Sequence, residues 1–422
     1  MTRDAPGTGA PSCDHAHEPA ALTVEQAHER VAAAIQPLTT TETVTLRAAL
    51  DRVLAADQVA TINIPSATNS AMDGFALRSA DLDQSGGARL RMVGTAWAGH
   101  PLERAIGRGE CARIMTGAPV PEGADTVIMQ ERTTTQEDCV EVRQAEPGAN
   151  IRPAGEDLAI GDLALAAGTR VRPAELGVLA SLGLTRVEVV RRPVVALFAT
   201  GDEITEPGQP LLPGRLYDSN RYTIHALLAR LGVEVDDRGH LPDEREAVEA
   251  SLRAAAAHAD VVVTTGGVSV GAADHVAPVL RAAGDVGFWR LTMKPGRPLN
   301  FGRLDNALFF GLPGNPVSAM VTAYQFVQPA VRHLAGEPYR PPRTYRVRAA
   351  ENLPKKPGRT EFQRGMLATG RDGVTEVRSV GAQGSGRLTS MARADCLMVL
   401  PAGSEGLRAG DWVEIQPFEG LT

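Results

Sequence analysis

VVVTTGGVSVGAADH (residues 261–275) is the stretch that decides the fold of this chain, and WRLTMKPGRP (289–298) and FFGLPGNPVSAM (309–320) follow it. Apolar runs that end in glycine- or proline-rich turns are typical of strands that lead into ligand-binding loops. Glycine lets a backbone approach a ligand closely, and the free N–H groups of such turns attract anions. Acids and bases are interleaved with these turns, so the stretch predicts a phosphate-binding, metal-assisted active site.

Strand and helix patterns alternate around this stretch. VVALFAT (194–200) is a continuous apolar run, which is typical of a strand buried on both faces. DSNRYTIHALLARLG (218–232) predicts a helix that Asp218 or Ser219 caps. The alternation predicts a doubly wound, mostly parallel α/β sheet over residues 191–336.

The rest of the chain divides by composition into other parts. A leader rich in Ala, Pro and Gly (1–20) is expected to be disordered. A helical and linker domain is predicted from two separate segments (21–60 and 151–190). Short β-prone runs broken by turn residues predict a β-rich domain (61–150) and a C-terminal β-barrel-like domain (337–422).

Composition argues against several classes of protein. A net charge of −7 disfavours a general nucleic-acid-binding protein, which would need a basic face. No apolar run is long enough to cross a membrane and no signal sequence is visible, so a cytoplasmic protein is expected. The four cysteines lack metal-ligand spacing, so neither a zinc or iron–sulfur site nor a disulfide framework is predicted.

Three acids are predicted to lie at the carboxyl edge of the sheet, where open parallel sheets bind ligands. Glu203 follows VVALFAT, Asp243 begins the helix after the next strand, and Asp274 closes the GGVSVGAAD turn. Mg²⁺ commonly binds through one or two carboxylates together with phosphate oxygens. The acids therefore predict a magnesium site, although Asp243 would also fit a simple helix cap.

Two bases lie on the Pro-Gly turn of KPGRP. Lys294 and Arg297 are placed to bind the remaining charge of a phosphate or an incoming oxyanion. Of the 43 basic residues only three are lysines, which adds weight to the lysine at this turn. The alternative for Arg297 is a solvated surface charge.

Two loops of the β-rich domain stand out less: NSAMDGFA around Asp73 and IMTGAPVPEGAD around Thr116. Taken alone, each is more typical of a tight turn than of a site. Arg152 and Asp157 lie in a further loop, NIRPAGED. No Ser/His/Asp or Cys/His combination indicates a nucleophilic enzyme, and isolated histidines such as His240 are expected to be structural or to face solvent.

Nine motifs follow one another in an order that resembles a known family. They are NSAMDGFA, RIMTGAPVPEGAD, NIRPAGED, ATGDEI, DSN, TTGGVSVGAAD, MKPGRP, GLPGNPVSA and GSGRLTSMARAD. Together they resemble the molybdopterin molybdenumtransferase family, which is MoeA in bacteria and the gephyrin E domain in animals. The resemblance extends from about Leu22 to the C-terminus. TGGVSVG and PGNP alone would also fit the related adenylyltransferases and the CinA-like domain.

The resemblance implies an elongated, four-domain homodimer whose active site lies between the α/β domain of one subunit and the β-rich domain of its partner. The implied reaction inserts molybdate into adenylylated molybdopterin and releases AMP, with Mg²⁺ as the cofactor. Molybdopterin adenylyltransferase and molybdoenzyme maturation proteins are candidate partners, whereas nucleic acids and membranes are not expected. The alternatives are that the chain is itself a molybdopterin adenylyltransferase or a non-catalytic scaffold.

The same resemblance implies roles for individual residues. The residues that serve metal and phosphate on one subunit would be Glu203, Asp243 and Asp274. The residues that come from the other subunit would be Asp73, Thr116 and Asp157, which are catalytic, and Arg152, which binds substrate. The residues that line the molybdate and pterin side would be Lys294, which is also catalytic, Arg297, Ser318, Arg359 and Ser385. The remaining substrate-binding candidates in the family motifs are Asp218, Ser219, Gly266, Gly267, Ser269, Arg290, Pro313, Gly314 and Asn315.

The chain departs from the family pattern at three of these motif positions. Family members often carry lysine where this chain has Arg290 and Arg297, and tyrosine where it has Phe75. The positive charge survives the first two changes, so activity is expected to survive as well. The hydrogen bonds at these positions are expected to differ from those of the family.

Overall fold

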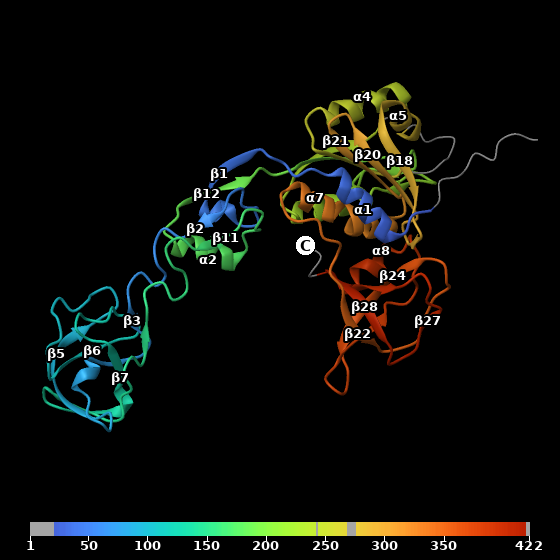
Figure 1. Cartoon of the computed structure of the whole chain (residues 1–422). Helices are drawn as coiled ribbons and strands as arrows, with labels where there is room; N and C mark the ends of the chain where they lie inside the picture. The colour runs from blue at the N-terminus through green and yellow to red at the C-terminus, as the bar shows by residue number, and fades with distance from the viewer. Residues whose placement is uncertain (1–20, 242–243, 268–275, 419–422) are drawn as a thin grey trace, which may run out of the picture. The chain divides into compact units, whose positions relative to one another are not determined.

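The computed structural model describes residues 21–241, 244–267 and 276–418. These residues form two compact units (Figure 1). One unit contains the chain up to Thr40 together with the chain from Val190 onward, and the other contains Thr41–Val189. Each unit builds its own hydrophobic cores. No helix among the described residues is long and apolar enough to cross a membrane.

The first unit is built on a mixed sheet of six described strands. Its parallel strands, in spatial order, are β16 (Glu234–His240), β13 (Val194–Ala199), β17 (Val261–Thr265) and β21 (Ala307–Leu312). The antiparallel strands that complete it are β20 (Pro298–Leu304) and β18 (Gly284–Arg290). The predicted doubly wound, mostly parallel α/β sheet is confirmed.

Helices cover both faces of this sheet. Successive residues of each strand point to opposite faces, and because both sets are apolar, each face needs a covering layer. On β17, Val261 and Val263 belong to one buried core and Val262 belongs to another. The helices of the first core are α1 (Val24–Ala34), α3 (Asn220–Arg230), α6 (Pro316–Thr322) and α7 (Gln328–Leu334), with the π-helical turn η4 (Ala323–Val327) between the last two. The helices of the second core are α4 (Arg245–Ala256) and α5 (Val276–Ala283).

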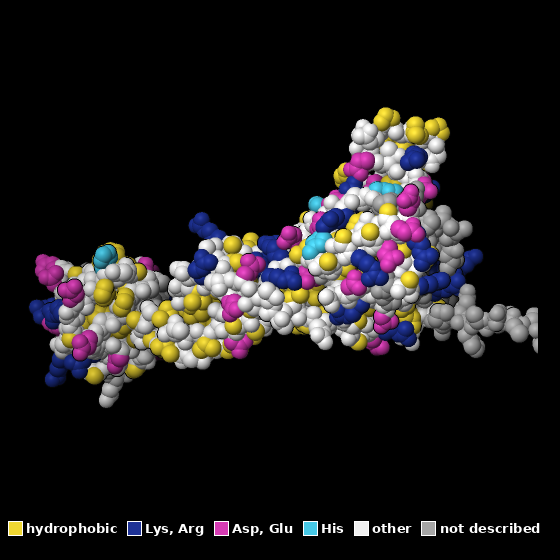
Figure 2. Space-filling view, turned by 90° about the horizontal axis from the view of Figure 1, so that it is seen from above, with side chains coloured by type: hydrophobic (Ala, Val, Ile, Leu, Met, Phe, Trp, Pro, Cys, Tyr) yellow, Lys and Arg dark blue, Asp and Glu magenta, His cyan; other side chains and the backbone are white. Residues whose placement is uncertain are grey.

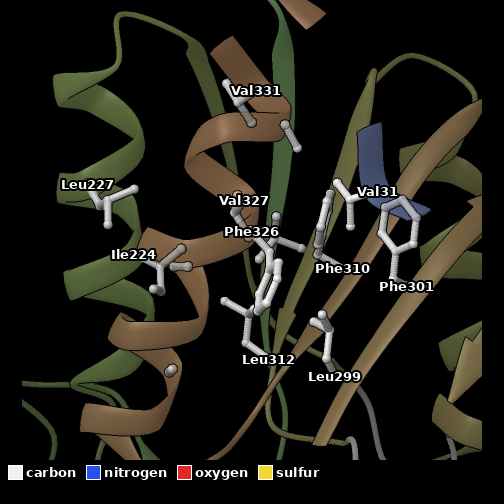
Figure 3. Close-up of a cluster of buried hydrophobic side chains, with 14 of the residues drawn as sticks. Val31, Ile224, Leu227, Leu299, Phe301, Phe310, Leu312, Phe326, Val327 and Val331 are labelled. Carbon is white, nitrogen blue, oxygen red and sulfur yellow. The ribbon is translucent and has the colours of Figure 1, made fainter. Parts of the chain in front are cut away.

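The first core is the larger of the two and joins distant parts of the chain. Figure 3 shows Phe326 of η4 beside Leu312 of β21, with Ile224 of α3 on one side and Phe310 on the other. Helix α1 adds Val31 to this core. Elements from the beginning, middle and end of the unit therefore depend on one another for burial.

The C-terminal part of the same unit is a closed barrel. Its described strands, in order around the barrel, are β24 (Thr360–Thr369), β25 (Thr375–Ser379), β22 (Tyr345–Ala349), β28 (Trp412–Pro417) and β26 (Cys396–Leu400). Strand β26 pairs back with β24, which closes the barrel and leaves no free edge between them. The short elements around the barrel are β19 (Met293–Lys294), β23 (Leu353–Pro354), β27 (Gly406–Leu407) and α8 (Leu388–Ala392). The predicted C-terminal β-barrel is confirmed.

The second unit contains a curled sheet with a core on each face. Its described strands, in spatial order, are β7 (Thr126–Met129), β4 (Gly74–Leu77), β6 (Glu110–Ile114), β5 (Ala88–Ala96), β9 (Cys139–Val142) and β8 (Thr133–Gln136). The 3₁₀ turns beside them are η2 (Ser79–Asp81) and η3 (Gln130–Arg132). Along β4, Phe75 and Leu77 enter one core and Ala76 enters the other, as the alternation of a strand requires.

The remainder of the second unit falls within the predicted helical and linker domain, and it contains less helix than that prediction suggests. Its strand pairs are β1 (Thr41–Thr45) with β12 (Arg186–Val190), β2 (Gln58–Val59) with β11 (Leu163–Leu165), and β3 (Asn69–Ser70) with β10 (Ile151–Arg152). The helical pieces are α2 (Pro173–Ser181) and the 3₁₀ turn η1 (Leu46–Ala49). A small core that contains Leu54, Val171 and Leu179 holds this part together.

Candidate active site

Three loops leave the carboxyl edge of the parallel strands side by side. Thr200 N donates to Thr265 O (3.1 Å), and Gly266 N donates to Leu312 O (2.9 Å). A Cβ on Gly266 would lie 2.5 Å from Thr200 Oγ1, and a Cβ on Gly314 would lie 3.9 Å from Gly266 Cα. Gly266 also has a φ of +93°, which glycine adopts at little cost. The glycines therefore let the turns meet where parallel sheets bind ligands.

Asn220, the first residue of α3, holds the Pro-Gly-Asn turn after β21. Its side-chain Nδ2 donates to Gly314 O (2.7 Å). Helix α6 begins behind the turn at Pro316, a position at which proline is compatible with a helix. The predicted substrate-binding residues Pro313 and Asn315 therefore lie in a turn that is held from two sides.

Asp218 and Ser219, the two predicted caps of α3, behave differently. Asp218 Oδ1 accepts from Arg221 N (3.0 Å) and its Oδ2 accepts from Arg221 Nε (2.9 Å), whereas the Ser219 side chain makes no capping bond. Arg221 also donates to Asp237 (2.6 Å) and to Glu206. Because both oxygens of Asp218 bind Arg221, this carboxylate anchors the start of α3.

Glu203 lies in an exposed loop that the strand pair β14 (Ile204–Thr205) and β15 (Leu216–Tyr217) closes. His240, at the end of β16, donates from Nε2 to Gly201 O (2.8 Å) and so ties this loop to the neighbouring strand. A Cβ on Gly201, whose φ is +119°, would lie 2.6 Å from the Glu203 carboxylate. Glycine at this position therefore lets the carboxylate fold back over the loop.

The structure describes the predicted metal site in part. Asp243 and Asp274, together with the predicted substrate-binding residue Ser269, lie outside the described residues. Within the described ranges, no group of three or more His, Cys, Asp or Glu side chains could hold a metal ion. The Glu203 carboxylate has no ion-pair partner there either. A free, exposed carboxylate is a donor that Mg²⁺ accepts, so Glu203 fits one ligand of such a site.

Lys294 is an accessible cation beside this edge. It lies in β19, which pairs in parallel with β24 and places Lys294 opposite Glu361. The Lys294 Nζ is 3.1 Å from Glu361 Oε1, and Gln363 Nε2 donates to Glu361 Oε2 (3.0 Å). Lys294 is 47% exposed and Glu361 is 8% exposed, so the ammonium is held by a buried carboxylate and still faces solvent. Arg297 closes the turn, since its carbonyl accepts from Leu291 N (2.7 Å).

The GSGR loop (residues 384–387) contacts the start of α6. Val317 N donates to Ser385 O (3.1 Å), so Ser385 lies next to the turn of helix that carries the buried Ser318. The two remaining predicted cations are exposed and lie nearby. Arg290 ends β18, which runs parallel to β21 and so reaches the same edge. Arg359 precedes Thr360, whose N–H donates to Thr292 O (2.9 Å). The carboxyl edge of the sheet thus gathers the glycine turn, the Pro-Gly-Asn turn, Lys294 and the GSGR loop.

Arg364 of β24 is a buried cation that no sequence motif indicates. Its Nε donates to Ser390 Oγ (3.1 Å) and its Nη2 donates to Gly384 O (3.2 Å), next to Ser385. No carboxylate of the described region pairs with it, and burial lowers the pKa of Arg364 to about 10. An uncompensated buried guanidinium is costly, so Arg364 is an additional candidate for anion binding. The signal for it, a charge on the face of a barrel strand that packs against α8, becomes visible only when the fold is known.

In the second unit, the loops around Asp73 and Thr116 meet. Strands β4 and β6 are antiparallel neighbours with Gly74 opposite Ile114, so the residue before β4 lies beside the loop after β6. Asp73 Oδ1 accepts from Thr116 N (2.7 Å) and from Thr116 Oγ1 (2.8 Å). These two hydrogen bonds hold the pKa of Asp73 below its ordinary value, and the bond from the Thr116 backbone has the larger effect. The carboxylate is therefore ionised and fixed in direction.

Arg152 and Asp157 belong to the same unit. Arg152 ends β10 opposite Asn69 of β3, and the backbone N–H of Asp157 donates to Ile64 O (3.0 Å). Both side chains are exposed and have no ion-pair partner in the part of the chain that the structure describes. Since β3 leads directly into the Asp73 loop, the predicted site residues of the β-rich domain and its linker occupy connected loops. The predicted site therefore falls into two groups, one in each unit.

Family models match three segments that together cover most of the chain. Residues 22–183 match the MoeA N-terminal region (domain I and II). Residues 196–333 match a probable molybdopterin binding domain, and residues 346–418 match the MoeA C-terminal region (domain IV).

Curated proteins and solved structures are similar over the same length. A molybdopterin molybdenumtransferase of Haemophilus influenzae is 43% identical over 95% of this chain and 99% of its own. One of Staphylococcus aureus is 36% identical over 88% of this chain and 90% of its own. The crystal structure of a molybdopterin biosynthesis moeA protein from Pyrococcus horikoshii OT3 is 29% identical, with a TM-score of 0.81 over 94% of this chain and 100% of the other.

Proposed function

Because the chain belongs to the molybdopterin molybdenumtransferase family, whose members are transferases of molybdenum cofactor biosynthesis, we propose that it inserts molybdate into adenylylated molybdopterin with Mg²⁺-dependent release of AMP. The observation that carries the proposal is the meeting of Gly266 and Gly314 at the carboxyl edge of the sheet, where α6 begins. The KPGRP turn that carries Lys294 packs against α6, since a Cβ on Gly296 would lie 3.5 Å from Ser318 O. Backbone turns without side chains accept a phosphate, and a fixed ammonium accepts an oxyanion.

The proposed chemistry requires charge neutralisation more than a nucleophile. An oxygen of water forms the new bond to phosphorus when the phosphoanhydride bond between the pterin phosphate and AMP breaks, and AMP leaves as an anion. Mg²⁺ would be held by Glu203 with Asp243 and Asp274, and it would neutralise phosphate charge. Lys294, fixed on Glu361, would orient molybdate, and the buried Arg364 would add a second positive charge beside the GSGR loop.

The two groups of predicted residues support a homodimeric site as a further part of this proposal. One group lies in each compact unit, and the family resemblance implies that a partner subunit supplies the Asp73 group. Mixing two inactive variants, Asp73→Asn and Glu203→Gln, tests this. Random exchange of subunits should restore about a quarter of the wild-type activity, because half of the dimers would then have one intact site. Mixtures that stay inactive after confirmed subunit exchange would contradict the shared site.

The decisive experiment measures AMP release from adenylylated molybdopterin. Purified protein with Mg²⁺ should release AMP when molybdate is added and much less when it is omitted. Chelation of Mg²⁺ should abolish the release. Formation of adenylylated pterin from ATP without any dependence on molybdate would instead support the adenylyltransferase alternative.

A scaffold without catalysis is the second candidate. Asp274→Asn removes one of the predicted metal ligands, so it should abolish AMP release while the protein still folds. Full molybdate-dependent turnover by this variant would count against the assigned metal site. A wild-type protein that folds and binds the pterin without any turnover would favour the scaffold.

A further inference from the structure

Arg113 lies at the polar end of a sheet face in the second unit. On β6 it is the register partner of Phe75 on β4, and Asp73 lies two residues before Phe75. Residues directly opposite on antiparallel strands share a face, and residues two apart on one strand share it too. Arg113, Phe75 and Asp73 therefore face the same side of the sheet, where the apolar core that contains Phe75 and Cys111 ends.

Two contacts fix the guanidinium of Arg113, and neither partner is charged. Its Cζ lies 5.7 Å from the centre of the Phe75 ring, and its Nη2 donates to Gln130 Oε1 (2.9 Å). Gln130 is itself tied to the same loop, because its backbone N–H donates to Asp73 O (3.2 Å). A guanidinium stacked on a ring and bonded on one side has a defined orientation and little rotamer freedom left to lose.

The charge of Arg113 is not neutralised within the described residues, in contrast to the ion pairs of the same strand three positions earlier. Glu110 there binds both Arg91 (2.6 Å) and Arg104. Arg113 has no carboxylate at ion-pair distance in the described chain, and Nε and Nη1 have no partner there. The Asp73 carboxylate is close enough for the charge of Arg113 to contribute to lowering its pKa, but it makes its hydrogen bonds to Thr116.

We propose that Arg113 is a further substrate-binding residue, whose guanidinium binds a phosphate of the adenylylated pterin beside Asp73 and Thr116. The inference rests on the proposed function for the identity of the substrate. Its physical basis is a preoriented, half-buried cation with free N–H donors, and a guanidinium matches the geometry of phosphate oxygens. Phe75 serves as the platform that keeps the guanidinium in position.

Arg113→Gln tests this inference, with Arg143→Gln as the matched control. Arg143 is an exposed arginine of the same unit that lies just after β9. The Arg113 variant should raise the KM for adenylylated molybdopterin about 10- to 100-fold, the range of a lost charged hydrogen bond, and change kcat less than about threefold. Arg113→Lys should give an intermediate KM, since it keeps the charge and loses the planar fork. The control should leave both constants unchanged.

Direct binding separates this inference from the proposed function. Equilibrium dialysis of adenylylated molybdopterin without molybdate should show weaker binding by Arg113→Gln than by wild type, even if no AMP is released by either. An unchanged affinity and KM in a variant with the wild-type melting temperature would overturn the role of Arg113. If Arg113→Gln does not fold, the affinity of Arg113→Lys tests the role of Arg113 instead. Binding of adenylylated molybdopterin by Arg113→Lys with wild-type affinity would overturn that role.

Discussion

Asp73 shows how a single side chain joins two loops that the sequence separates by 43 residues. Its Oδ1 accepts both bonds from Thr116, so Asp73→Asn should keep the fold, because an amide oxygen accepts the same bonds. Loss of the negative charge should lower AMP release about 100-fold or more if the carboxylate acts on charge in the transition state. Steady-state assays and thermal melting together measure both effects.

Asp83 provides the matched control for this prediction. It holds a loop of the same unit by accepting from Ser85 Oγ (2.6 Å), Gly87 N (3.0 Å) and Ser85 N (2.8 Å). The hydroxyl bond and then the two backbone bonds likewise lower the pKa of Asp83. Asp83→Asn should therefore leave the rate of AMP release unchanged. Equal loss of activity in both variants would mean that Asp73 acts only by holding its loop.

His28 makes the stability of the first unit depend on pH. Burial lowers the pKa of His28 to about 4, below the ordinary value of 6.5. Between pH 6.5 and 4 the unfolded chain binds a proton that the folded chain does not, so the free energy of unfolding is fully retained above pH 6.5 and falls as the pH decreases to 4. The loss should reach about 3 kcal/mol at most.

His28→Phe tests this dependence, since the new ring would fill the same space beside Phe326 without titrating. The variant should lose the bond between His28 Nδ1 and the Tyr339 hydroxyl (2.9 Å), and its stability should change less between pH 7 and pH 5. Urea unfolding at both pH values measures the difference. His100→Gln, at an exposed position, should keep the wild-type dependence. A His28→Phe profile as steep as that of wild type would contradict this explanation.

At the scale of elements, the contact between α3 and the turn after β21 should matter for substrate binding. Asn220→Ala removes the donor to Gly314 O and should raise the KM about tenfold, because the Pro-Gly-Asn turn loses one of its two supports. Asn220→Asp should behave similarly, since a carboxylate cannot donate. Steady-state kinetics of AMP release would show the change.

The matched control for Asn220 lies on the same helix. Tyr222→Phe removes an exposed hydroxyl that donates to Glu206 Oε1 (2.6 Å), so it should leave the KM at its wild-type value. If Asn220→Ala and Tyr222→Phe both raise the KM, then the stability of α3, and not the turn, explains the effect.

The sequence predicts a feature well where residues close together in the sequence determine it. It predicts a feature poorly where contacts between segments far apart in the sequence determine it. The apolar runs, glycine turns and helix starts around β13, β17 and β21 were sufficient for the central sheet. The cap of α3 is predicted as Asp218 or Ser219, and in the structure the Asp218 side chain caps the helix, because its Oδ1 accepts from the backbone N–H of Arg221. The burial of Arg364 between β24 and α8 could not be predicted, since it depends on contacts between segments that are far apart in the sequence.

The candidate site was predictable in outline for the same reason. The residues of each motif are neighbours in sequence, so their turns were visible, whereas the bonds between motifs were not. Asn220 with Gly314, His240 with Gly201, and Val317 with Ser385 each join motifs from different elements. His240 was expected to be structural or to face solvent, and the structure gives it a contact through which it positions the Glu203 loop.

At the scale of the whole molecule, separate cores predict separate unfolding of the two units. Phe326 is fully buried in the core of the first unit, so Phe326→Ala should lower the stability of that unit by about 3–5 kcal/mol. Calorimetry should resolve two transitions, of which only the one belonging to the first unit shifts.

An exposed residue of the first unit provides the control. Leu216 is 63% exposed, and Leu216→Ala should leave both transitions in place. A single transition that shifts as a whole in Phe326→Ala would show that the two units unfold together. The barrel should melt with the central sheet, because Phe362 and Leu397 of the barrel belong to the same buried core.

The order in which the chain is synthesised gives one of these contacts a consequence in time. Helix α1 emerges from the ribosome early, but Leu38 beyond it donates its N–H to Leu334 O (2.9 Å), and Val31 packs in the core that contains Val331. The second unit is complete before any strand of the central sheet exists, so it can fold first as domains generally do. The apolar side of α1 therefore stays uncovered until the chain has been translated through α7. We expect the nascent chain to need a chaperone at this segment.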